Sequence, residues 1–370
     1  MYHFQQAPAW FISLALLGVV CVAAFTSRLL VHLTWCLRRH RDLRHRYGAW
    51  AVVTGPTSGI GRSVALELAR RGLNLVLVDL NAANLQEVSD TIRSRHAVKT
   101  ITVVFDLSLV STPQGDEALR RLRGTLKGLD VGVLVNNAGV AEPGAVFLHE
   151  ADAEDWVRMI RVNLWAVTEV TAAVLPGMVE RGRGTVVSMG SASSEAISSF
   201  PLHTMYAATK RYVAQLSRSL YVEYKSKGID VQCQAPFFVA TPMLLGFSEI
   251  WRPSAFVPTT DAYARAAVRW MGQGGPLCVP NLKHRLLGCL LAAVPNSVQD
   301  WVCLHGNCGP ERCSGSRQRA RCVDEMNHLV PVNTCSAEKR SSAKSCIAFL
   351  YCMYAFSTCK SAHLDSLSWT

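Results

Sequence analysis

The sequence predicts an α/β fold, a Rossmann-type doubly wound parallel sheet with an N-terminal transmembrane helix. From residue 50 onward, short apolar runs that suit buried parallel strands alternate with longer helical patterns. A glycine-rich turn follows the first of these runs and opens into a helical pattern, which is the context of a dinucleotide-binding turn. An uncharged apolar segment precedes this region. The chain of 370 residues is long enough for one large domain and an anchor.

Residues 1–46 are expected to form a membrane anchor with a basic flank. Residues 7–27 carry no charged side chain, and about 20 apolar residues suffice to cross a bilayer as a helix. Arginines follow from Arg28 to Arg46, but no lysine or arginine precedes the run, so it fits a signal peptide poorly. The positive-inside rule then places the rest of the chain in the cytosol. The alternatives are a buried core helix and a re-entrant hairpin that includes residues 29–37.

The composition restricts the class of partner. Hydrophobic residues make up 49% of the chain, which is high for a soluble protein, and the formal net charge is +11. The sequence shows no nucleic-acid-binding motif and no basic face with interleaved aromatic residues, so we expect no nucleic acid partner. The basic stripe beside the apolar segment explains part of the charge, and affinity for a phosphate-bearing substrate is a second explanation.

The first predicted strand covers residues 51–53, and the first helix of the sheet domain covers residues 62–71. The glycines of the turn between them permit a tight bend and a close approach of the backbone to a pyrophosphate at the helix N-terminus. The alternative is that these glycines only let the helix pack on the strand. The expected cofactor-binding residues of this turn are Thr54, Gly55, Ser58, Gly59, Ile60 and Gly61.

Polar residues stand at the ends of the next predicted strands. A strand over residues 75–78 ends in an aspartate, where the hydroxyls of an adenosine ribose are expected. A helix over residues 82–95, a strand over 100–105, a charged helical pattern and a strand over 131–135 follow in order. The cofactor-binding residues expected at these strand ends are Asp79, Asp106, Asn137, Ala138 and Gly139.

Two isolated polar residues precede the catalytic motif. A predicted helix over residues 153–179 contains Asn163, which is either a satisfied core amide or a functional group. The fifth strand, over residues 185–188, opens into a small polar segment that includes Ser191. Because this strand end faces the same edge of the sheet as the other strand ends, we expect it to lie close to the cofactor.

A helix over residues 206–225 carries Tyr206 and Lys210, which lie on one face because residues four apart share a face of a helix. A tyrosine and a lysine at this spacing are most often solvated, so the motif gains weight only from the segments before it. Together they suggest hydride transfer to or from a carbonyl group, with the tyrosine handling the proton. A strand over residues 229–234 follows, and then residues 236–241.

The C-terminal region shows no clear periodicity. The sheet domain is expected to cover residues 47–302, and residues 303–370 to form a tail rich in Cys, Ser and Arg that is disordered or atypical. Most of the 13 cysteines lie in this tail. The spacing of Cys303, Cys308, Cys313 and Cys322 with His305 fits no familiar zinc pattern, so we predict no metal site.

With these motifs, the chain resembles the short-chain dehydrogenase/reductase family over about residues 47–279. Within that family it is similar to the membrane-bound very-long-chain 3-oxoacyl-CoA reductases of plants. The stretches that carry this similarity are residues 46–56, 128–137, 174–178, 220–225 and 228–234. The resemblance implies reduction of a fatty 3-ketoacyl-CoA to the 3-hydroxyacyl-CoA with NADPH. It also implies a place in the endoplasmic reticulum membrane, with the catalytic domain facing the cytosol, beside other elongase subunits.

The resemblance also implies roles for the polar residues. Tyr206 would be the general acid, and Lys210 would favour the phenolate and hold the nicotinamide ribose. Ser191 would donate a hydrogen bond to the substrate oxygen, and Asn163 would hold a water that links Lys210 to solvent. The remaining cofactor contacts, to the nicotinamide carboxamide, would come from Val239 and Thr241. Many family members place this serine thirteen positions before the tyrosine, which selects Ser193; the plant reductases select Ser191, which we favour.

Two questions stay open at the level of sequence. Asp79 favours NADH, because a carboxylate there would repel a 2′-phosphate, whereas the resemblance favours NADPH. The substrate is the other question, since a steroid or other lipid hydroxyl dehydrogenase would carry the same catalytic residues. A catalytically idle paralogue that binds elongase partners is a further alternative. Residues 244–258 are expected to form a substrate lid.

Overall fold

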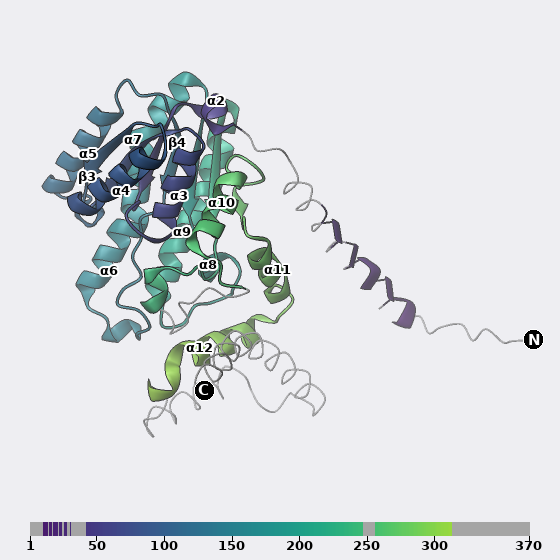
Figure 1. Ribbon diagram of the computed structural model, residues 1–370. Helices are drawn as coiled ribbons and strands as arrows, with labels where there is room; N and C mark the ends of the chain where they lie inside the picture. Colours follow the sequence, from purple (N-terminus) through teal and green to yellow (C-terminus); the bar gives the residue numbers. More distant parts are fainter. Residues whose placement is uncertain are drawn as a thin grey trace, which may run out of the picture. The chain divides into compact units, whose positions relative to one another are not determined.

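A seven-stranded sheet with all neighbouring strands parallel is the centre of the protein (Figure 1). The computed structural model describes residues 42–246 and 256–312, and part of residues 10–30. The strand order β3-β2-β1-β4-β5-β6-β7 reverses direction between β1 and β4, which confirms the doubly wound prediction. The strands are β1 (Trp50–Thr54), β2 (Asn74–Asp79), β3 (Thr100–Val104), β4 (Val131–Asn136), β5 (Gly184–Met189), β6 (Ile229–Gln234) and β7 (Leu277–Cys278).

Helices cover both faces of this sheet. Side chains alternate along each strand, so Val53 and Leu77 join one apolar cluster while Val52 and Val76 join the cluster on the other face. The first cluster is covered by α3 (Gly59–Arg70), α4 (Ala82–Arg95) and α10 (Thr260–Trp270). The second cluster is covered by α5 (Pro113–Leu126), α7 (Ala166–Arg181) and α9 (Thr204–Tyr224). All strands are parallel, so their carboxyl ends meet at one edge of the sheet.

The predicted helix over residues 153–179 is interrupted. It consists of α6 (Ala153–Ile160), a π-helical turn η3 (Arg161–Trp165) and α7. The whole stretch is long and apolar enough to cross a membrane, but half of its most apolar window is buried inside the domain, as in a core helix. Single π turns are rare and often mark functional sites. This one leaves Asn163 fully buried.

Several elements near the C-terminus were not expected from the sequence. Helix α10 and strand β7 extend the sheet domain, and α11 (Leu282–Leu291) and α12 (Asn296–Arg312) follow. Helix α12 passes through residue 302, so the expected domain boundary falls inside a helix. The rest of the tail, residues 313–370, lies outside the described part of the chain, as do residues 247–255 of the expected lid. The remaining short elements are α8 (Ala192–Glu195), η1 (Leu107–Leu109), η2 (Leu148–Glu150), η4 (Lys225–Lys227) and η5 (Pro242–Gly246).

Helix α2 (Leu43–Tyr47) lies at the amino-terminal edge of the sheet. Tyr47 is 2% exposed, and its hydroxyl donates a hydrogen bond of 2.5 Å to Oδ2 of Asp230 at the start of β6. Arg46 forms an ion pair with the same oxygen at 3.0 Å. The amide of Ala49 donates to Asp130, just before β4. The compact domain therefore begins at Asp42, a few residues before the boundary expected from the sequence.

The described residues among positions 10–30 are helical. Their large apolar side chains are 49–65% exposed. A helix that is apolar on all sides needs a partner or a bilayer to cover it. The described positions leave gaps, so the expected transmembrane helix stays a prediction.

Replacing Tyr47 with phenylalanine is expected to lower the free energy of unfolding by about 1.5–3 kcal/mol, because a buried hydrogen bond to a carboxylate is lost. Urea unfolding of the full chain in detergent measures the change. Tyr221→Phe is the matched control, since this hydroxyl meets only the exposed amine of Lys225. Its effect should stay within about 0.5 kcal/mol. Equal losses in the two variants would contradict the proposed contribution of Tyr47.

Candidate active site

The two glycine-containing motifs predicted from the sequence lie side by side at the carboxyl ends of β1 and β4. The hydroxyl oxygen of Thr54 accepts hydrogen bonds from the amides of Asn137 at 3.0 Å and Ala138 at 3.1 Å. In the other direction, Nδ2 of Asn137 donates to the carbonyl oxygens of Thr54 and Gly55. These bonds join the turn after β1 to the segment after β4. They therefore hold the two segments together at the point where the strand order reverses.

The turn between β1 and α3 has room only for glycine at its closest points. A Cβ atom on Gly61 would lie 2.0 Å from the carbonyl oxygen of Gly55, and Gly55 itself has a φ of +66°. The N-cap residue of α3, Ser58, makes no side-chain hydrogen bond to the first turn. The amides of Gly59 and Ile60 at this helix end are therefore not capped by a side chain. Such a helix N-terminus favours a phosphate group, so the turn fits a dinucleotide.

Asp79 ends β2 beside this turn. Its carboxylate accepts hydrogen bonds from the hydroxyl of Thr57 at 2.7 Å and from the amide of Leu80 at 2.7 Å. Thr57 was not predicted as a site residue, and only its place in the turn could have suggested it. Arg62, which directly follows Gly61 of the turn, donates to Glu87 at 3.0 Å. The end of β2 therefore presents a carboxylate, and the guanidinium of Arg62 is paired with Glu87.

The other three expected cofactor residues have different surroundings. Asp106 follows β3, and its Oδ1 accepts hydrogen bonds from the amide and the hydroxyl of Ser108. Thr241 lies against the glycine turn, because its Cγ2 is 3.3 Å from the position of a Cβ on Gly59. Val239 is buried in the apolar cluster on the α3 side of the sheet. The segment after β6 thus reaches the glycine turn through Thr241, and the cofactor contacts expected of Asp106 and Val239 stay predictions.

Helix α9 buries Tyr206 and Lys210 together. Lys210 is 6% exposed and its Nζ donates a hydrogen bond of 3.0 Å to the carbonyl oxygen of Met189, at the end of β5. The same nitrogen lies 5.7 Å from the centre of the Tyr206 ring. The two side chains therefore lie close together on one face of α9, as expected from their spacing, and their catalytic roles stay a prediction.

Burial shifts the pKa values of both groups. Burial raises the pKa of Tyr206 above its usual value of 10.0, and a hydrogen bond with Ser191 acts in the opposite direction. Burial lowers the pKa of Lys210 to about 8, because the charged ammonium loses water. Without cofactor and substrate, the phenol of Tyr206 is therefore a weaker acid than a free phenol. Its phenolate needs further stabilisation before Tyr206 can act as an acid near neutral pH.

Ser191 and Ser193 both lie at the start of α8, but they have different positions. Ser191 is the hydrogen-bond partner of Tyr206. Ser193 donates from its hydroxyl to Oγ of Ser191 at 2.8 Å and from its amide at 3.2 Å. Because the oxygen of Ser191 accepts these bonds, its own hydrogen is available for an acceptor at the site. The geometry therefore favours Ser191 over Ser193 as the residue beside the phenol.

Asn163 uses its side chain to hold the segment after β4. Its Oδ1 accepts from the amide of Val140 at 2.8 Å, and its Nδ2 donates to the carbonyl of Val140 and to the hydroxyl of Thr209. A Cβ on Gly139 would lie 3.3 Å from both Oδ1 of Asn163 and Nζ of Lys210. Asn163 therefore positions the backbone beside Lys210, and its expected role in holding a water stays a prediction.

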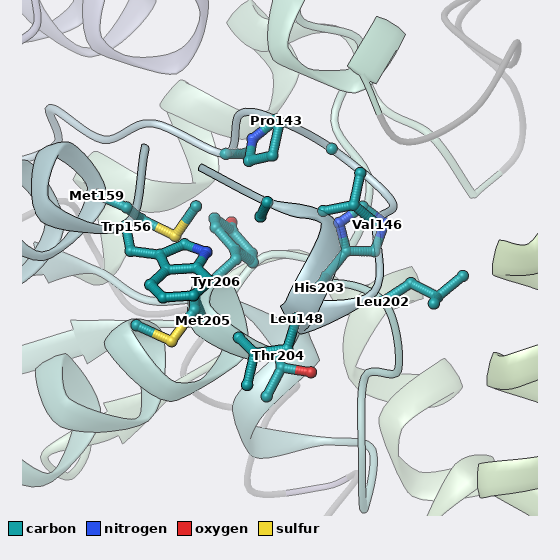
Figure 2. A pocket seen from close by; sticks show the side chains of 13 residues that line it. Pro143, Val146, Leu148, Trp156, Met159, Leu202, His203, Thr204, Met205 and Tyr206 are labelled. Carbon is teal, nitrogen blue, oxygen red and sulfur yellow. The ribbon is translucent and has the colours of Figure 1, made fainter. Parts of the chain in front are cut away.

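An apolar pocket lies beside the Tyr206 ring, and sequence reasoning missed it (Figure 2). Its lining comes from the loop after β4, from α6 and from the start of α9. Trp156, Met159 and Met205 lie around the tyrosine ring in Figure 2. His203 also lines the pocket, stacks on Phe200 and has its pKa lowered to about 4 by burial, so it is neutral near pH 7. The residues that line this pocket lie far apart in the sequence, so no local pattern marks them.

No group of three or more histidine, cysteine, aspartate or glutamate side chains in the described part of the chain is arranged to hold a metal ion.

The sequence model of the short chain dehydrogenase family matches residues 49–249 of this chain. The chain belongs to the short-chain dehydrogenase family. The match spans the glycine turn, Asn163, Ser191, Tyr206 and Lys210, and it covers more than half of the sequence.

Relatives of this short-chain dehydrogenase align over about two thirds of its length. A very-long-chain 3-oxoacyl-CoA reductase-like protein of Arabidopsis thaliana is 44% identical over 69% of this chain and 80% of its own. The very-long-chain 3-oxoacyl-CoA reductase of Rattus norvegicus is 38% identical over 71% of this chain and 78% of its own. An inactive hydroxysteroid dehydrogenase-like protein 1 of Homo sapiens is 38% identical over 71% of this chain and 77% of its own.

A solved structure supports the assignment of the cofactor class. A short-chain dehydrogenase from Sphingobium yanoikuyae in complex with NADPH has a TM-score of 0.55 and 29% identity, and the comparison covers 66% of this chain and 96% of that one. This short-chain dehydrogenase is therefore an oxidoreductase that uses a nicotinamide cofactor. That the glycine turn, Asp79 and the segment 137–139 hold this cofactor stays a prediction.

The buried amine of Lys210 is expected to titrate near pH 8 in the cofactor-free protein. Its pKa in the folded state lies below the ordinary 10.5, so the unfolded chain binds more protons between these two values. The penalty on stability is complete below about pH 8 and disappears as the pH rises to about 10.5. Urea unfolding of the full chain and of Lys210→Met over this range measures it. The stability of the unmodified protein should rise relative to the variant, and parallel curves would contradict the assignment.

Proposed function

We propose that this protein reduces the 3-keto group of a very-long-chain fatty acyl-CoA to a 3-hydroxyl group during fatty-acid elongation. The observation that carries the proposal is the buried pair Tyr206 and Lys210, with Ser191 hydrogen-bonded to the phenol. The relatives named very-long-chain 3-oxoacyl-CoA reductases support the choice of substrate class.

The proposed chemistry uses the phenol as the proton donor. The substrate carbonyl oxygen would accept hydrogen bonds from the hydroxyls of Tyr206 and Ser191. A bound reduced nicotinamide supplies the hydride to the carbonyl carbon. Tyr206 gives its proton to the carbonyl oxygen as negative charge develops there, and Lys210 stabilises the phenolate that is left. Because burial opposes ionisation of Tyr206, the positive charge of Lys210 is needed at this point.

The apolar side chains beside Tyr206 support a lipid substrate; the cavity between them, about 20 Å³, holds roughly one water and has to widen to admit an acyl chain. Its lining includes Val146, Leu148, Trp156 and Met159, which offer no charged side chain to the substrate. An acyl chain next to the reacting carbonyl would be covered by such residues, and apolar contact of this kind is favourable in proportion to the area buried. A steroid ring would also fit an apolar lining, so the steroid alternative is decided by assay.

The relative that is named inactive raises the alternative of an idle paralogue. In this chain Asn163, Ser191, Tyr206 and Lys210 are all retained, and they are joined by the contacts described above. A protein that only bound other elongase subunits would not require this arrangement. The retained site therefore supports catalysis rather than a scaffold role.

The anchor and the location of the protein belong to the same proposal. We infer that residues 1–46 hold the protein in the endoplasmic reticulum membrane, with the catalytic domain in the cytosol and other elongase subunits nearby. The uncharged run over residues 7–27, its exposed apolar side chains and the arginines that follow it support this inference.

We also propose that Asp79 makes NADH the preferred cofactor. A carboxylate at this position accepts hydrogen bonds from ribose hydroxyls and repels a 2′-phosphate. Arg62, which could have compensated, is paired with Glu87. The names of the relatives do not decide between the two cofactors.

The first test compares substrates and variants. The purified chain should reduce a 3-ketoacyl-CoA faster than a steroid ketone. Tyr206→Phe should lower turnover by about 10²–10⁴-fold with cofactor binding nearly unchanged, because general acid catalysis contributes that much. Lys210→Met should weaken both turnover and cofactor binding. The control is Tyr212→Phe, since this hydroxyl on the same helix bonds Thr168 outside the site. Most of the turnover surviving in Tyr206→Phe would refute the mechanism, and a preference for the steroid would refute the substrate class.

The second test measures the dissociation constants of NADH and NADPH. The unmodified protein should bind NADH about tenfold more tightly, a difference of about 1.4 kcal/mol, which is modest because Asp79 is only partly buried. Asp79→Arg should reverse the preference. Thr57→Val is the companion variant, since it keeps the carboxylate and removes only its hydroxyl partner. Tighter binding of NADPH by the unmodified protein, with no gain in the arginine variant, would show that Asp79 does not set the preference.

A further inference from the structure

Helices α11 and α12 form a bent apolar pair near the C-terminus of the described chain (Figure 1). The residues over 286–294 carry no charged side chain. The segments Leu282–Leu291 and Asn296–His305 together are apolar enough for a membrane span, but they meet at 116°. The ten residues of α11 are about 15 Å long, which is half of the roughly 30 Å of a bilayer core. The pair therefore cannot cross a membrane as one straight helix.

The inner side of this pair is attached to the catalytic domain by polar contacts. His284 is fully buried, and its Nδ1 accepts from the amide of Phe237 at 3.3 Å while its Nε2 donates to the carbonyl of Phe256 at 3.1 Å. One helical turn later, Gly288 lies against the Phe237 ring. Residues 284 and 288 share a face of α11. This face of α11 therefore packs against the loop between β6 and α10.

The second helix is attached to the loop between α8 and α9. Nε2 of Gln299 donates to the carbonyl oxygens of Leu291 and Val294 at 2.9 Å each, so it closes the corner between the two helices. Its Oε1 accepts from the amide of Ser198. Asp300 accepts from the hydroxyls of Ser198 and Ser199 at 2.6 Å. The pair is therefore joined to the loop that follows Ser191 and to the loop that contains Thr241.

The opposite side of α11 is apolar, with exposed leucines at its two ends and the half-buried Leu286 between them. Leu282, Leu286 and Leu290 recur every four residues, which places them on one stripe, about half a turn away from His284 and Gly288. Leu282 is 36% exposed and Leu290 is 47% exposed. We call these three leucines the leucine stripe. Lys283 and Arg285 stand beside it in the first turns of the helix, and Lys283 is exposed.

We propose that the leucine stripe of α11 lies in the headgroup and acyl boundary of a lipid bilayer, as a second membrane contact of the protein. The occupant is a bilayer rather than a protein, because an apolar stripe flanked by cations is the pattern of a helix that lies in a membrane surface with anionic lipids. The sharp bend keeps both helices at the surface. Because the pair is bonded to the loop after Ser191 and to the loop that contains Thr241, the proposal places the candidate active site near the lipid surface.

The test uses the full chain reconstituted into vesicles that contain phosphatidylcholine and phosphatidylserine. A photoreactive diazirine side chain replaces one residue at a time, and adducts are identified by mass spectrometry. Leu290 reports on the stripe. Val222 is the matched control, because it is an apolar residue of α9 that is 72% exposed and far along the chain from α11. Val19 reports on the N-terminal apolar segment, and cofactor binding verifies that each variant is folded.

The expected result is lipid adducts at Leu290 and Val19, and no lipid adducts above background at Val222. Lipid adducts at Val19 without adducts at Leu290 would overturn the proposal and leave the N-terminal anchor in place. Adducts to protein rather than lipid at Leu290 would also overturn it, since the stripe would then cover a partner chain. Equal lipid adducts at Leu290 and Val222 would show unspecific contact and would refute it as well. None of these outcomes depends on the substrate that the enzyme reduces.

Discussion

The ammonium of Lys210 has to be held inside the protein, where a charge is costly unless polar groups replace its water. The groups that do so come from separate strand ends. Met189, at the end of β5, offers its carbonyl oxygen at 3.0 Å, and Gly139, after β4, leaves space that a side chain would fill. Asn163 holds that backbone in place through Val140. The parallel order of β4, β5 and β6 brings these segments to one edge, and the catalytic arrangement depends on that order.

The two edges of the sheet have separate tasks. At the amino-terminal edge, Asp230 and Asp130 bind the segment that leads from the N-terminal residues into β1. At the carboxyl edge, the loops carry the cofactor crevice, the catalytic residues and the attachments of α11 and α12. A change in the loops can therefore alter substrate or membrane contact while the sheet stays intact, as is general for this kind of fold. The apolar pocket beside Tyr206 lies at the carboxyl edge, because it is lined in part by the loop after β4.

The sequence was sufficient for features that depend on local pattern. The alternation of strands and helices, the glycine turn, the place of Asp79 and the shared face of Tyr206 and Lys210 all follow from spacing along a few residues. The sequence was not sufficient where partners are distant. The bond between Thr57 and Asp79, the π turn at Asn163 and the contact of His284 with Phe237 arise only when separate elements pack. Strand β7 was missed because two residues carry too little periodicity to be recognised.

The bond between Tyr47 and Asp230 joins residues 183 positions apart in the chain. A ribosome releases the N-terminal part first, so α2 emerges long before its partner strand exists. Contacts of such separation also close late, because a long loop must be ordered before they form. Helix α2 can contact Gly72 and β4 earlier, but its attachment is not complete on the growing chain until β6 has been synthesised. The N-terminal apolar segment can reach a membrane during that interval, before the catalytic domain has taken its final form.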